Sequence, residues 1–228
     1  MQDSGTFLQT SSRLEQGRAR PQDRSRCGVT ACFAWNPAPA LLGSHERSLR
    51  ALPNVVVNEV SFEQWDPGEL RFDIGFAAQS FHWLDPDERL PKLAKVIRSR
   101  GALAIFGHSS EIGSPTLRTA MDAAYQKHAP TLSQRDNARS WYSSSTSPVV
   151  DEINTSPHFR DLEFTFVEWS QDLSPESYCD LLCTYSDHST LSSGQRDPLL
   201  DAVREAICHH GDTIRLDYRT GLFLTRVT

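Results

Sequence analysis

The 228-residue sequence has no run of about 18 consecutive apolar residues, the length that a helix needs to cross a bilayer. It also contains no G-x-S-x-G, Walker or H-E-x-x-H motif. These motifs mark nucleophile elbows, phosphate-binding loops and zinc-dependent proteases. We therefore expect no membrane span, and the sequence offers no support for those enzyme classes.

Basic residues are in the minority, with 23 Lys and Arg against 29 Asp and Glu and a net charge of -6. A nucleic-acid surface needs clustered positive charge, so we expect a small-molecule partner and no nucleic acid. The five cysteines are an odd number without a secretory signal, which favours free thiols in a cytoplasmic location. No CxxC pair occurs, and Cys179, Cys183 and Cys208-His209-His210 match no zinc spacing. We expect no metal site.

The apolar content of 38% is enough for one α/β domain. Phe72–Ala78 is an apolar run typical of a central parallel strand. Asp85 and Pro86 can begin a helix that Gly101 ends, and a second buried strand follows at 102–106. This order of elements predicts a right-handed βαβ unit. Ligands of open α/β sheets bind where such strands end.

The segment FDIGFAAQSFHWLDP, with its following helix and RGALAIF, resembles the second half of class I S-adenosylmethionine-dependent methyltransferases that act on small molecules. The resemblance continues through Phe164–Trp169, LSPESYCDLLCTYSDHSTL and YRTGLFLTRV, about three quarters of the chain. It implies an α/β fold, a Rossmann-like methyltransferase sheet with helices on both faces and an antiparallel C-terminal strand pair. The implied reaction is methyl transfer from S-adenosylmethionine to a small-molecule acceptor.

The resemblance also implies site residues. A third strand at Val55–Val60 precedes a turn that resembles the adenine side of the cofactor site, so Ser61 and Phe62 are predicted cofactor-binding residues. Ala78 and Gln79, at the end of the 72–78 strand, are the others. His82 follows them beside the predicted cleft, where it could orient or deprotonate an acceptor as the catalytic residue. The alternative is that His82 caps the loop while Trp83 packs beneath the helix.

Aromatic side chains are the other candidates for the substrate site. The serine-rich segment 135–147 is predicted to be a loop at the rim of the site, where Trp141 and Tyr142, with His82, would bind substrate. Trp65 and Trp169 are expected to be core residues.

The first 50 residues depart from the family. No G-x-G occurs before Val55, and Phe33-Ala34-Trp35 stands where relatives have an acidic residue for the cofactor ribose. We therefore expect the first strand and its glycine-rich loop to be absent or degenerate. Residues 1–26, with five arginines and little apolar periodicity, predict a disordered or poorly packed tail, followed by a methyltransferase-like domain at 27–228. The improved match from about Leu52 favours an altered or truncated gene start.

Local patterns predict further elements along the chain. A strand is predicted at Gly28–Phe33 and a helix at Asn36–Ala51. Ser114-Pro115 begins a helix that extends to Ala129, and an insertion at about 174–211 has two helices, which begin at Ser174-Pro175 and Asp197-Pro198. Asp187 and His188, inside the insertion, could form an acid-base pair, but adjacent residues on a helix rarely face one another, so a solvated helix end or a cap is the favoured interpretation. Strands are predicted from Phe159 to Trp169 and over the last segments, Thr213–Tyr218 and Leu222–Val227.

Two other functions stay open. Without the glycine-rich loop, the chain could be a catalytically inactive remnant that acts as a pseudoenzyme or an interaction module. A nicotinamide-dependent dehydrogenase would share the doubly wound sheet, but the sequence has no G-x-G-x-x-G motif to bind its cofactor.

Overall fold

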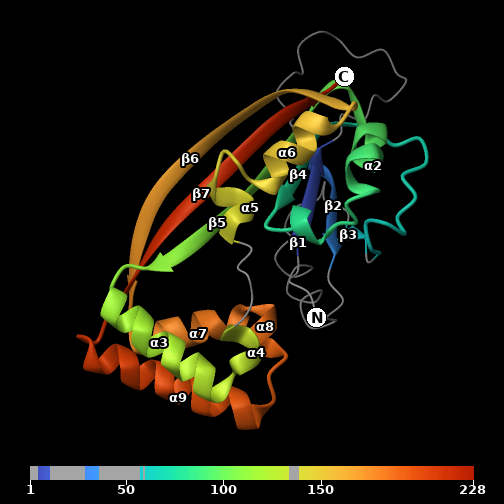
Figure 1. Ribbon diagram of the computed structural model, residues 1–228. Coiled ribbons are helices and arrows are strands. Elements are labelled where there is room, and N and C mark those ends of the chain that lie inside the picture. The colour runs from blue at the N-terminus through green and yellow to red at the C-terminus, as the bar shows by residue number, and fades with distance from the viewer. Residues whose placement is uncertain (1–4, 11–28, 36–56, 59, 134–138) are drawn as a thin grey trace, which may run out of the picture. The chain divides into compact units, whose positions relative to one another are not determined.

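The structure is a computed structural model that describes residues 5–10, 29–35, 57–58, 60–133 and 139–228. Its sheet has seven strands in the order β3-β2-β1-β4-β5-β7-β6 (Figure 1). The strands are β1 (Gly5–Thr10), β2 (Val29–Trp35), β3 (Val57–Asn58), β4 (Phe72–Ala78), β5 (Ile97–Ile112), β6 (Phe159–Leu173) and β7 (Ile214–Val227). The predicted tail and the predicted helix at 36–51 lie outside the described residues, except that β1 falls within the tail.

Strand β4 is central, as the apolar run predicts. It pairs in parallel with β5, where Gly75 is opposite Leu103 and Ala78 is opposite Phe106. Phe72 and Ala77 are buried, at 1% and 0% exposure. Strand β4 ends at Ala78, opposite Phe106, while β5 continues to Ile112. In open α/β sheets, ligands bind beyond the carboxyl ends of such strands.

The first strand, expected to be absent or degenerate, is present in the sheet as β1. Gly5–Thr10 lies between β2 and β4 and is antiparallel to both, with Phe7 opposite Phe33 and Ala77. Six residues with little apolar periodicity can form this strand, because the backbone of a central strand needs hydrogen-bonding partners on both edges, whatever the side chains are. The carboxyl end of β1, at Thr10, consequently lies toward the edge opposite to the carboxyl end of β4.

The described helices are η1 (Phe81–Trp83), α2 (Arg89–Val96), α3 (Pro115–His128), α4 (Pro130–Ser133), α5 (Arg139–Ser143), α6 (Pro148–Thr155), α7 (Pro175–Thr184), α8 (Ser186–Ser189) and α9 (Ser193–His209). None of them is long and apolar enough to cross a membrane. Two compact units divide the chain. We call Ser4–Gly107, Ser145–Thr165 and Leu222–Thr228 the sheet unit, and His108–Ser144 with Phe166–Gly221 the helical unit.

The helical unit has its own core. Figure 1 shows α3, α4, α7, α8 and α9 gathered together, and buried side chains from α3, α7, α9 and β7 form one cluster that includes Met121, Leu182 and Val203. Ser114 and Ser174 cap α3 and α7 by accepting hydrogen bonds from backbone amides at 3.3 and 3.2 Å. Both of these predicted helix starts are confirmed.

Several predicted boundaries are wrong. Helix α9 begins at Ser193, so Pro198 lies inside it instead of at its start. The two predicted C-terminal strands are one strand, β7, which lies beside β6. Helix α2 ends at Val96, and the left-handed residue after it is Arg100 (φ 63°), while Gly101 is in β5. Gly101 is needed there because a Cβ would lie 2.8 Å from the carbonyl oxygen of Asp73.

A buried arginine fixes the segment that follows β4. Arg89, on α2, is 2% exposed and forms an ion pair with Glu152 of α6. Its guanidinium also donates to the carbonyl oxygens of Phe81 (2.9 Å) and Leu84 (3.2 Å) and lies over the Phe81 ring at 4.4 Å. One side chain thus joins α2, α6 and the loop at the exit of β4.

Arg89→Ala should lower the free energy of unfolding by about 3 kcal/mol, because it leaves a partly buried carboxylate and two buried carbonyl groups without their partner. Urea denaturation followed by circular dichroism measures this. Arg98→Ala is the matched control: its ion pair with Asp73 is 38% and 53% exposed, so the loss should be about 0.5 kcal/mol or less. Equal losses for the two variants would contradict the conclusion that Arg89 joins α2, α6 and the loop after β4.

Candidate functional site

The exit of β4 has an unusual backbone. Gln79 adopts a left-handed conformation (φ 50°), and its amide donates to the carbonyl oxygen of Phe106 at 2.8 Å. This conformation costs a non-glycine residue about 1 kcal/mol or more and is enriched at ligand sites. The predicted cofactor-binding residues Ala78 and Gln79 lie at this turn of the chain away from the sheet, and both are half-buried.

Buried polar atoms follow at the same place. Among the residues that the structure describes, the hydroxyl of Ser80 and the Nε1 of Trp83 have no hydrogen-bond partner, and Ser80 is only 5% exposed. Native proteins satisfy most buried polar atoms, so two such atoms within four residues indicate a place for a ligand or water. His82 lies between them, half-buried, with its ring centroid 4.6 Å from that of Trp83.

The turn with Ser61 and Phe62 lies beside this loop. The carboxylate of Glu63 accepts the amide of Asp85 at 3.2 Å, and the ammonium of Lys92 donates to the carbonyl of Glu63 at 2.8 Å. The Ser61 hydroxyl accepts the amide of Gln64 at 3.2 Å. The sheet unit therefore places the 60–65 segment against the segment that follows η1.

Phe62 itself is a core residue in the described structure. It is 4% exposed and its ring centroid is 6.4 Å from that of Trp65. Trp65, at 7% exposure, packs against Phe72, and its predicted place in the core is confirmed. A contact between the Phe62 ring and a cofactor stays a prediction.

Trp141 and Tyr142 belong to the helical unit. They lie on α5, a short helix, where the sequence predicts a loop. Tyr142 is 2% exposed, and Gly221 approaches it so closely that a Cβ there would lie 2.0 Å from the Tyr142 carbonyl oxygen. Tyr142 is thus a packing residue, while Trp141 is half-buried. Their predicted part in substrate binding is not tested by this geometry.

A polar network that the sequence did not indicate joins α3 to α8. The Tyr125 hydroxyl lies 2.7 Å from Nε2 of His188, and Nδ1 of His188 lies 2.6 Å from the carboxylate of Asp187. Burial is the main cause that raises the pKa of Tyr125 above its ordinary value. The phenol therefore keeps its proton, and the two ring nitrogens of His188 contact the Tyr125 hydroxyl on one side and the Asp187 carboxylate on the other.

The expectation that Asp187 and His188 lie at a solvated helix end is wrong. His188 is 4% exposed, and adjacent residues meet here because the Asp187 carboxylate also accepts the backbone amide of His188 at 2.8 Å. The partner, Tyr125, is 63 positions away in the sequence. The segment around the pair, TYSDHSTL, is mostly polar and gives no signal of this burial.

The expectation that Trp169 is a core residue is also wrong. Its side chain is 43% exposed and stacks on Tyr218, with the ring centroids 4.0 Å apart and the planes at 5°. His108 meets the Tyr218 ring edge-on at 5.4 Å. Trp169 and Tyr218 line a cavity on β5, β6 and β7 in the helical unit, and the His108 ring packs against both of them.

Solved structures share this fold. A protein from Anaeromyxobacter dehalogenans assigned as a type II methyltransferase superposes with a TM-score of 0.50 and 19% identity, over 85% of this chain and 79% of that one. A protein from Bacillus halodurans assigned as a methyltransferase superposes with a TM-score of 0.50 and 14% identity, over 85% of this chain and 81% of that one. The chain therefore has the Rossmann-like methyltransferase fold, and the predicted fold class is confirmed.

Curated proteins named as methyltransferases are also similar to this chain in sequence. Uncharacterized methyltransferases of Mycobacterium bovis and Mycobacterium tuberculosis are each 24% identical to this chain over 177 residues, which is 78% of the chain. The chain spans 64% of the length of these relatives. No protein-family model matches the sequence. The resemblance drawn from the Phe72–Phe106 segment is confirmed by these relatives and by the fold.

The Tyr125–His188 contact can be measured with a double-mutant cycle. Tyr125→Phe should lower the free energy of unfolding by about 1–2 kcal/mol, because it leaves Nε2 of a buried imidazole without its hydrogen-bond partner. The coupling between Tyr125→Phe and His188→Phe in urea denaturation at pH 7 should be about 1 kcal/mol. Additive losses would show that the two side chains do not interact in solution.

Proposed function

We propose that this chain binds S-adenosylmethionine at the exit of β4 and transfers its methyl group to a small-molecule acceptor. The observation that carries the proposal is the left-handed Gln79 at the carboxyl end of a central parallel strand, followed by buried polar atoms without partners. The methyltransferase fold and the curated relatives support it. The acidic balance of the chain favours a small acceptor over a nucleic acid.

The described residues at this exit fit part of the cofactor. The Ser80 hydroxyl and the Trp83 indole can each donate a hydrogen bond to a polar ligand atom without breaking a hydrogen bond that the structure shows. The Ser61–Phe62 turn lies beside the same loop through the Glu63–Asp85 contact. S-adenosylmethionine, when bound, supplies an electrophilic methyl group on a sulfonium ion.

His82 belongs to the acceptor side in this proposal. Its half-buried ring lies against Trp83, on the one-turn helix η1, and Arg89 holds that turn through the carbonyl of Phe81. An imidazole fixed in this way can orient an acceptor and hold the proton that the acceptor loses. Methyl transfer depends chiefly on aligning the acceptor with the methyl group, so orientation is the main task of His82.

One observation favours a second candidate, a protein that keeps the fold without binding the cofactor. In the fold's usual cofactor site, the loop after the first strand lies at the carboxyl edge of the sheet and binds the cofactor with its backbone. Here β1 is antiparallel to β4, so its carboxyl end, at Thr10, lies toward the other edge. A pseudoenzyme or an interaction module would have this property.

Isothermal titration calorimetry of the full chain with S-adenosylmethionine, and with its demethylated product, separates the two candidates. We expect binding of one cofactor per chain. Ser80→Ala should weaken binding about threefold to tenfold, the value of one hydrogen bond, without lowering the melting temperature, because the hydroxyl has no partner to lose.

Ser147→Ala is the matched control, since Ser147 is also a buried serine of the sheet unit, at 0% exposure. Its hydroxyl accepts the amide of Val150 and caps α6. This variant should lower the free energy of unfolding by about 1 kcal/mol and leave cofactor affinity unchanged. No measurable binding by the folded wild-type chain would overturn the proposal in favour of the second candidate.

A further inference from the structure

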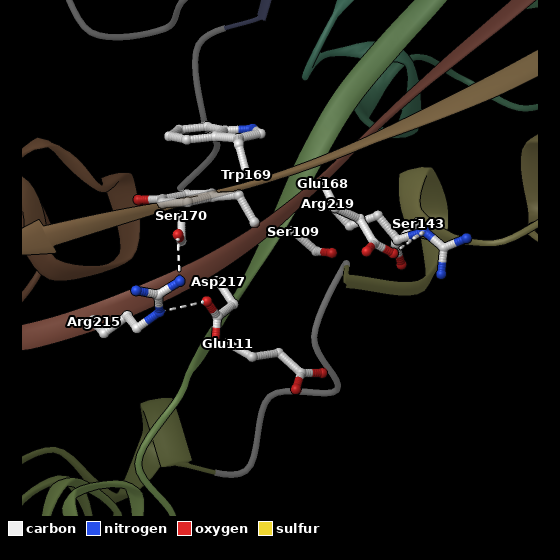
Figure 2. A pocket seen from close by; sticks show the side chains of 10 residues that line it. Ser109, Glu111, Ser143, Glu168, Trp169, Ser170, Arg215, Asp217 and Arg219 are labelled. Carbon is white, nitrogen blue, oxygen red and sulfur yellow. Dashed lines mark hydrogen bonds and ion pairs between the residues drawn. The ribbon is translucent and has the colours of Figure 1, made fainter.

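The helical unit contains a cavity of about 590 Å³, a size in the usual range for small-molecule sites. It is lined by residues of β5, β6 and β7 and by Ser143 of α5 (Figure 2). The chemistry of the lining is unusual in one respect, because a flat aromatic surface and several charged groups occur together. Neither the predicted cofactor residues nor His82 lines this cavity.

The aromatic part is rigid. Trp169 and Tyr218 are stacked at 4.0 Å with nearly parallel planes. The indole Nε1 of Trp169 donates to the hydroxyl of Thr220 at 3.0 Å, which fixes the rotation of the ring. His108 supports Tyr218 from the edge. Because Tyr218 is 6% exposed and Trp169 is 43% exposed, the indole is the ring that a ligand can reach.

The two titratable members of this stack carry no charge near neutral pH. Burial raises the pKa of Tyr218, so the phenol stays protonated. Burial lowers the pKa of His108, so its imidazole stays neutral at pH 7. The stack of Trp169, Tyr218 and His108 therefore offers a ligand an aromatic surface that carries no positive charge.

Each charged group in the lining already has an opposite charge. Arg215 contacts Asp217 at 3.1 Å and donates to the Ser170 hydroxyl at 2.6 Å, as Figure 2 shows. Arg219 lies 3.9 Å from Glu168. Glu111 lies 3.5 Å from Arg118, just outside the lining. A charged ligand would have to compete with these pairs, whereas a neutral ligand would not.

We propose that this cavity binds a neutral, planar aromatic small molecule, which stacks on Trp169 and receives hydrogen bonds at its edge from the polar lining. Stacking supplies the shape selectivity, since a flat ring makes full contact with a flat indole. The paired charges supply the selectivity for a neutral ligand. This site is independent of the proposed function, because its residues belong to the helical unit and bind no cofactor in that proposal.

Four probes of the same carbon skeleton test the proposal on the full chain: 2-naphthol, the saturated decahydro-2-naphthol, 2-naphthoate and 2-naphthylmethylamine. Binding is measured by saturation-transfer NMR and calorimetry at pH 7, without S-adenosylmethionine. We expect 2-naphthol to bind with submillimolar affinity. The saturated alcohol should bind at least about tenfold more weakly, and the anion and the cation at least about threefold more weakly.

Variants then place the probe. Trp169→Ala should weaken 2-naphthol binding about threefold to tenfold, while Trp169→Phe, which keeps a flat ring, should stay within about twofold of wild type. Phe164→Ala is the matched control on the same strand: Phe164 is 45% exposed and does not line the cavity, so this variant should bind as wild type does. Melting temperatures establish that each variant is folded, and Trp169→Leu replaces Trp169→Ala if the latter unfolds.

Several results would overturn the proposal: no binding of 2-naphthol at millimolar concentration, equal binding of the saturated alcohol, preference for either charged probe, or unchanged affinity in Trp169→Ala or its substitute Trp169→Leu. None of these outcomes depends on cofactor binding. Failure of this proposal and failure of the proposed function are therefore distinguishable, because the first is measured with aromatic probes alone and the second with S-adenosylmethionine alone.

Discussion

Strand β4 has hydrogen-bonding partners along both edges, and the rest of the sheet depends on this constraint. A central strand with a bare edge would bury several amide and carbonyl groups without partners, each at a cost of about 1–3 kcal/mol. Strand β5 satisfies one edge in parallel and β1 satisfies the other in the antiparallel direction. Because hydrogen bonding can be satisfied in either direction, the sheet tolerates a reversed strand at its centre. The reversed direction leaves the hydrogen bonds intact, but it places the carboxyl end of β1, at Thr10, toward the edge opposite to the carboxyl end of β4.

The parts of the fold that the sequence predicts well are those set by local pattern. Phe72–Ala78 is recognisable because an uninterrupted apolar run fits a strand between two others, and Ser114-Pro115 because a cap and a proline specify a helix start. The start of α9 could not be predicted in this way. Pro198 is the sixth residue of α9, so its missing amide removes one hydrogen bond inside the helix, yet the helix begins five residues before it, at Ser193.

The candidate sites show the same difference between features set by local pattern and features set by tertiary packing. Ala78, Gln79 and His82 follow a strand whose end is predictable, so their common position at the β4 exit could be predicted from the sequence. The Tyr125–His188 contact and the Trp169–Tyr218 stack join residues 63 and 49 positions apart. Such contacts depend on tertiary packing, which no periodicity of a single segment contains. Exposure is the clearest example, since nothing in FTFVEW distinguishes the half-exposed Trp169 from a core tryptophan.

Satisfaction of buried polar groups distinguishes the two units. In the helical unit, the buried His188 is satisfied by Tyr125 and Asp187. In the sheet unit, Arg89 satisfies the carbonyl groups of the loop after β4, yet the Ser80 and Trp83 donors on that same loop are left without partners. A loop whose backbone is held so firmly cannot easily turn these donors toward water. Their unsatisfied state is therefore a property of the fold, and a polar ligand at the β4 exit would remove its cost.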